Sequence, residues 1–176
     1  MTSRTLFAGL AIGAACLASA AQAKTVIYTA ALDGKTATSA TGSAATAKAT
    51  LSVDTASQQV NLQLDVEGIP LDRLRAGLVK APVGPIHLHI YAGHDHEHAE
   101  AELLLPVPYG PSYAATAKGF SVKVAGYPYA AGAAVLKSDV AFDKFIADLD
   151  SGDVVLNIHT EAFPNGEISG VMVKKG

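Results

Sequence analysis

The sequence contains no tryptophan and a single cysteine, and only 16% of its 176 residues are charged. Together with 49% hydrophobic residues, this low charge excludes an intrinsically disordered chain. Lys and Arg number 13 against 16 Asp and Glu, so the chain offers no basic surface for a phosphate backbone. We therefore expect one folded domain with no nucleic-acid partner.

Residues 1–23 are predicted to be a cleaved export signal. Arg4 supplies the positive start, residues 6–17 form an apolar run, and residues 21–23 (AQA) give a small-residue cleavage site. The apolar run is shorter than the roughly 20 residues of a transmembrane helix, so we expect no retained membrane span. The expected product is a periplasmic or secreted domain of residues 24–176. It has no cysteine, which excludes thiolate metal ligands and cysteine catalysis.

The remaining chain has the period-two pattern of strands with one buried face. Residues 46–53 and 60–66 alternate between apolar and polar side chains on either side of a polar turn at 54–57, which predicts an antiparallel hairpin. Because one face of such a sheet must be covered, we expect an all-β, antiparallel, Greek-key-like sandwich or barrel of about eight strands. The other predicted strands are 25–32, 86–91, 103–107, 119–124, 153–160 and 167–173.

Two segments have helical spacing instead. Apolar residues in 71–78 and 140–149 recur every three or four positions, which predicts one or two short helices. Residues 106–113 contain three prolines and are predicted to be a loop, because proline cannot take part fully in a central strand.

The six histidines lie in only two places. Strand alternation puts His87 and His89 on one face, about 6.5 to 7 Å apart. In the strand predicted at 153–160, His159 shares a face with Asn157. If the two strands are neighbours, the three imidazoles can bind one metal ion, and copper stands above zinc in the affinity order. The alternative is that these histidines are half-buried strand residues bonded to backbone.

A second cluster follows at His94, His96 and His98, within a segment that also carries four carboxylates. Such a tract can collect metal weakly, and the alternative is a solvated acidic loop. The sequence has no Gly-x-Ser-x-Gly elbow and no glycine-rich phosphate loop, so we expect no enzyme.

The end of the chain resembles the closing motif of the CHRD (chordin) domain. The residues are Asn157-Ile-His159-Thr, then Pro-Asn-Gly and Gly-Glu-Ile-Ser169-Gly, where Ser169 stands in place of the usual arginine. The segments IHLHIYAG at 86–93 and TAALDG at 29–34 also fit the family. The resemblance implies an exported all-β domain, which in animals sits in a protein that binds growth factors.

The order of the histidines is also similar, more weakly, to the copper ligands of copper/zinc superoxide dismutase. The dismutase's disulfide, further metal ligands and catalytic arginine have no clear counterparts here. Three interpretations follow, in this order of preference: an exported, non-catalytic protein that binds copper, or less readily zinc; an interaction or structural module without metal, whose partner is another exported protein or a second copy; and a dismutase-like redox enzyme.

Overall fold

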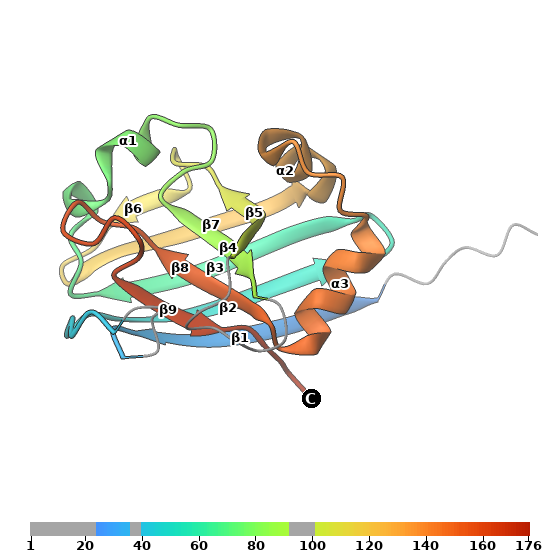
Figure 1. Cartoon of the computed structure of the whole chain (residues 1–176), viewed down its shortest axis with the longest axis horizontal. Coiled ribbons are helices and arrows are strands. Elements are labelled where there is room, and N and C mark those ends of the chain that lie inside the picture. The colour runs from blue at the N-terminus through green and yellow to red at the C-terminus, as the bar shows by residue number, and fades with distance from the viewer. Residues whose placement is uncertain (1–23, 36–39, 92–100) are drawn as a thin grey trace, which may run out of the picture.

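The computed structural model describes residues 24–35, 40–91 and 101–176. Its ten strands form one sheet, and its helices are short (Figure 1). The predicted all-β antiparallel class is confirmed. The predicted signal at 1–23 and the histidines at 94, 96 and 98 lie outside the described residues.

The strands are β1 (Thr25–Asp33), β2 (Thr46–Asp54), β3 (Gln59–Glu67), β4 (Ile86–Ile90), β5 (Glu102–Val107), β6 (Tyr113–Ala115), β7 (Gly119–Pro128), β8 (Val154–Ile158), β9 (Ile168–Val171) and β10 (Val173–Lys174). The helices are a 3-10 turn η1 (Leu71–Arg73), α1 (Ala76–Val79), α2 (Tyr129–Leu136) and α3 (Phe142–Ser151).

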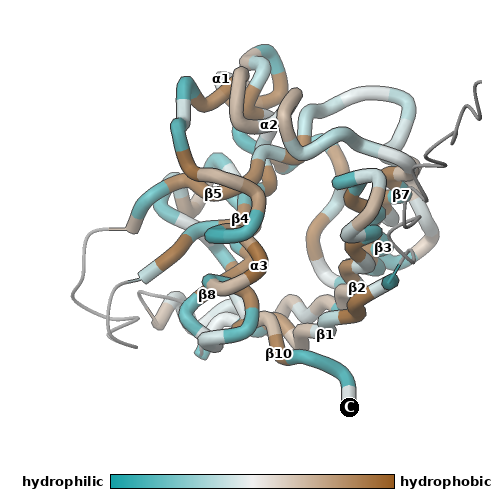
Figure 2. The backbone as a smooth tube through the Cα atoms, turned by 90° about the vertical axis from the view of Figure 1, so that its right-hand side faces the viewer, coloured by the Kyte–Doolittle hydropathy of each residue, from teal (hydrophilic) through white to brown (hydrophobic). Residues whose placement is uncertain are grey.

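The sheet is curled so that its two ends approach one another. Its order is β5-β4-β8-β9-β1-β2-β3-β7-β6, with β10 beside β1, and all pairs are antiparallel. Figure 2 shows β4, β5 and β8 on one side and β2, β3 and β7 on the other. The Tyr113 hydroxyl of β6 donates a hydrogen bond to the Val107 carbonyl of β5 (2.7 Å), so the two edge strands meet. Gly132 of α2 packs against Leu105 of β5 and Tyr127 of β7, so α2 also contacts both ends of the sheet.

The meander β1-β2-β3 follows the predicted alternation. Tyr28, Leu51 and Leu62 are paired across the three strands and point into the core, while the intervening residues mostly face solvent. The predicted turn is present, because Asp54 Oδ1 accepts hydrogen bonds from the backbone N–H groups of Ala56 (2.9 Å) and Ser57 (3.0 Å). The predicted hairpin is therefore confirmed.

The helices correspond only partly to the prediction. α3 buries Phe142, Phe145 and Leu149 in the core, as the spacing within 140–149 predicts. Residues 71–78 form η1 and then α1, separated by the bridge between Leu74 and Thr160. The prediction did not include α2 (YAAGAAVL), which buries only Tyr129 and Gly132, because its alanine-rich sequence has no amphipathic pattern.

The predicted loop at 106–113 begins later than expected. β5 continues through Pro106 to Val107, and the chain leaves the sheet only at Pro108. β5 is an edge strand of the sheet, and an edge strand tolerates a residue without an N–H donor. Within the described ranges, no helix is both long and apolar enough to span a membrane.

Candidate metal site

The candidate site lies where β4 and β8 run side by side. Their register pairs His87 with Asn157 and His89 with Val155, on the face opposite the core residues of the same strands. His159 directly follows β8, and its N–H donates to the Pro85 carbonyl (2.9 Å), which continues the ladder by one residue pair. The conditional prediction that the two histidine-bearing strands are neighbours is thus fulfilled.

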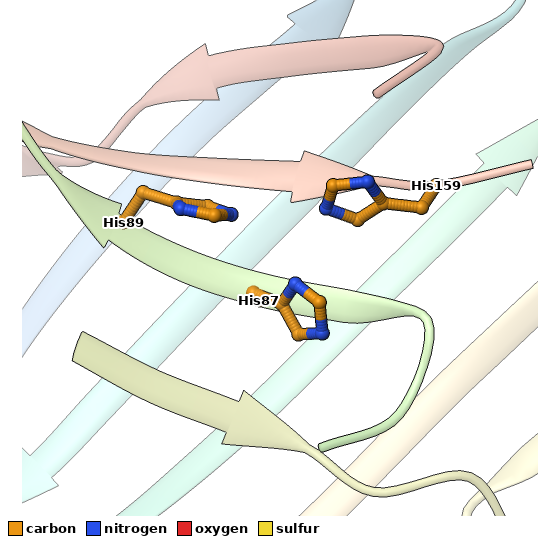
Figure 3. A group of neighbouring side chains, drawn as sticks. All are labelled: His87, His89 and His159. Atoms are coloured by element: carbon orange, nitrogen blue, oxygen red, sulfur yellow. The ribbon is translucent and has the colours of Figure 1, made fainter. Parts of the chain in front are cut away.

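This register brings the three predicted imidazoles together (Figure 3). The ring centroids of His87 and His159 are 4.8 Å apart, while His89 lies 5.6 Å from His87 and 5.9 Å from His159. One nitrogen atom from each ring can be chosen so that all three lie within 4.8 Å of one another. Among the residues described, this is the one cluster of three or more His, Cys, Asp or Glu that could hold an ion.

All three rings are held in the neutral form that a metal ligand requires. His87 is 4% exposed and His159 is 7% exposed, whereas His89 is half-buried. Burial, reinforced by the neighbouring His159, lowers the pKa of His87 to about 3 and that of His89 to about 4. Burial also lowers the pKa of His159. A lone pair is therefore available on each ring at neutral pH.

Two of the rings are oriented by backbone carbonyls. His87 Nε2 lies 2.6 Å from the Gly84 oxygen, and His159 Nδ1 lies 2.9 Å from the Pro164 oxygen. The remaining nitrogens, Nδ1 of His87, Nε2 of His159 and both of His89, are buried and have no hydrogen-bond partner in the described part of the chain. A carbonyl bonded to one imidazole nitrogen while the other stays free is the arrangement that commonly supports a metal-binding histidine.

The sequence builds both carbonyls into glycine-dependent turns. Gly84 has a φ of +74°, and a Cβ there would lie 2.1 Å from the Val107 oxygen. Gly166 has a φ of +119° and packs against the Asn157 amide, which donates to the Asn165 carbonyl (3.2 Å). Gly166 thus supplies the positive φ of the Pro-Asn-Gly turn, and the Asn157 side chain helps to fix that turn.

Sequence reasoning missed the residues that support the rings. Gly84 stands three positions before His87 in a Gly-Pro pair that signals a turn, but nothing local shows that its carbonyl reaches the ring. Arg75 was also missed, and its Nη1 donates to the Pro164 carbonyl (3.2 Å) that accepts from His159. Ser169, at the position of the usual arginine, is fully buried in β9 opposite Asn157.

A curled antiparallel sheet that brings together three imidazoles, from β4 and from the end of β8, defines an all-β domain with a candidate metal centre. The model of the CHRD domain family matches residues 28–172, and the chain belongs to that family. The match includes both histidine-bearing strands and the closing turn, as the resemblance in the sequence implies. No curated protein and no solved structure matches the chain.

Proposed function

We propose that this protein is an exported, non-catalytic metal-binding member of the CHRD family, with copper as its preferred ion. The observation that carries the proposal is the convergence of His87, His89 and His159, with an unpaired nitrogen on each ring among the described residues. Three neutral nitrogens and a fourth position for water or an exchanging ligand suit a copper or zinc ion.

The donor set favours copper over zinc. Imidazole nitrogen binds both ions, and Cu²⁺ stands above Zn²⁺ in the general affinity order for nitrogen sites. The only cysteine of the chain is Cys16, inside the predicted export signal, so the folded domain offers no thiolate. Export to an oxidising compartment, where copper is handled as Cu²⁺ as well as Cu⁺, is part of the proposal.

His94, His96 and His98 are proposed to form a second, weaker site. The three side chains alternate with acidic residues in the sequence HDHEH, and an imidazole-rich tract of this kind collects divalent ions loosely. Its role would be to raise the local concentration of metal, separate from the tight site.

The test is a metal titration of the protein purified from cells that express the whole chain. We expect one tight copper ion, lost in His159→Ala and retained when His94, His96 and His98 are all replaced by alanine. The triple variant is the matched control, because it removes three imidazoles, against one in His159→Ala, and leaves the three-histidine cluster intact. Superoxide turnover, measured on the copper-loaded protein, should be absent.

Other outcomes select other functions. Absence of any tight ion would favour an interaction or structural module. Metal-dependent superoxide turnover that is lost in His159→Ala would favour the dismutase-like enzyme. Loss of the tight ion in the triple variant, with His159→Ala unaffected, would show that the two histidine clusters have been assigned the wrong way round.

A further inference from the structure

We propose that the three-histidine site is asymmetric: Nδ1 of His87 and Nε2 of His159 are fixed ligands, and His89 is the ligand that adjusts when the ion binds. This inference rests on the proposed function. It adds which nitrogen atoms bind and which ring adjusts to the ion.

The two fixed ligands follow from the carbonyl contacts. A carbonyl oxygen can only accept a hydrogen bond, so the ring proton of His87 sits on Nε2 and that of His159 sits on Nδ1. The lone pair is then on the opposite nitrogen, Nδ1 of His87 and Nε2 of His159, and these are the two atoms left without a partner in the described chain. Rotating either ring to use its other nitrogen would break a hydrogen bond to a backbone carbonyl.

The carbonyls cannot easily follow a rotating ring. The backbone at Gly84 packs so closely against Val107 that its φ and its oxygen are held in place. The Pro164 oxygen sits in a turn tied down by Asn157 and also accepts from Arg75. The two acceptors therefore act as rigid supports.

His89 differs from the other two in each of these respects. Neither of its nitrogens has a hydrogen-bond partner among the described residues, and both nitrogens are buried, although the residue as a whole is only half-buried. It also lies farther from both partners than they lie from each other. A ring free of hydrogen bonds can present either nitrogen and can rotate about its side-chain bonds at small cost.

Around a tetrahedral ion with bonds of about 2.0 Å, ligand nitrogens stand about 3.3 Å apart. Here one nitrogen from each ring lies within 4.8 Å of the other two. Because His87 and His159 are bonded to carbonyls held in turns, any adjustment that brings the nitrogens closer together falls to His89.

The test reads the tautomers directly by long-range proton–nitrogen NMR of the ¹⁵N-labelled, unsubstituted protein, without metal and then with Zn²⁺, which is diamagnetic. We expect His87 to carry its proton on Nε2 and His159 on Nδ1 in both states. His89 should be a mixture of tautomers that becomes a single form when Zn²⁺ binds. The opposite tautomer at His87 or His159, in a protein that does bind Zn²⁺, would overturn this inference while leaving the proposed function standing. The expected tautomers with no response to Zn²⁺ or Cu²⁺ would contradict the proposed function instead.

Discussion

Replacing Gly84 by alanine should damage both the fold and the metal site. Its φ of +74° is in the left-handed region, and a Cβ would lie 2.1 Å from the Val107 oxygen and 2.9 Å from the Pro108 Cα. Both obstacles are backbone, so no flexible side chain can move aside. Strain of this kind costs on the order of 1–3 kcal/mol, and we expect a loss of about 3 kcal/mol of unfolding free energy. For a protein of this size that corresponds to a drop in Tm of roughly 6–12 °C.

The same change should weaken metal binding, because the Gly84 carbonyl holds the ring of His87. Loss of such a supporting contact lowers metal affinity by roughly 10- to 100-fold. The matched control is Gly110→Ala, since Gly110 has no positive φ and a Cβ there would meet nothing within 4 Å. Thermal unfolding followed by circular dichroism and a copper competition titration measure the two effects. If Gly84→Ala unfolds and binds copper as Gly110→Ala does, the argument from the glycine-supported carbonyl is wrong.

Three further predictions concern His159, the pH dependence of stability and the hydrogen bond of Tyr28. His159→Ala should abolish the stabilisation by copper, which for an intact site amounts to about 2.7 kcal/mol at a hundredfold excess over Kd; an undiminished rise in Tm would refute its role as a ligand. The metal-free protein should lose stability as pH falls from about 6.5 towards 3, because unfolded His87 and His89 take up protons that the folded state excludes. Urea unfolding at several pH values checks this, and His87→Ala should show a shallower dependence. Tyr28→Phe should cost about 1 kcal/mol by removing the hydrogen bond to Asp150 (2.6 Å), with urea unfolding again as the measurement.

The strands were predictable because their information is local. In β2 and β3 every second side chain enters the core, so the period-two pattern of the sequence is the burial pattern of the structure. α2 was not predictable, because alanine-rich residues fit a helix, a strand or a loop, and its place is set by contact with Leu105 and Tyr127. The strands β6 and β10 are too short for a period to be visible.

The candidate site was predictable only in part, because it depends on a pairing of strands that are far apart in the sequence. Alternation alone places His87 and His89 on one face, but the approach of His159 depends on the pairing of β4 with β8, which are separated by three strands and two helices along the chain. No local pattern specifies such a long-range pair. The resemblance of residues 152–170 to the closing motif of the CHRD family compensated for this, because it assigns His159 to that motif.

The buried ring nitrogens of the three histidines carry a cost to the fold. Four ring nitrogens of the cluster are buried without a hydrogen-bond partner in the described chain, and each such group costs roughly 1–3 kcal/mol. An apolar residue of similar size would avoid that penalty. We therefore predict that His89→Leu raises the unfolding free energy of the metal-free protein by about 1–2 kcal/mol while lowering its copper affinity. Urea unfolding without metal, together with a copper titration, measures both quantities. A variant that is less stable than the parent and still binds copper equally well would show that His89 is held in the sheet for structure and not for metal.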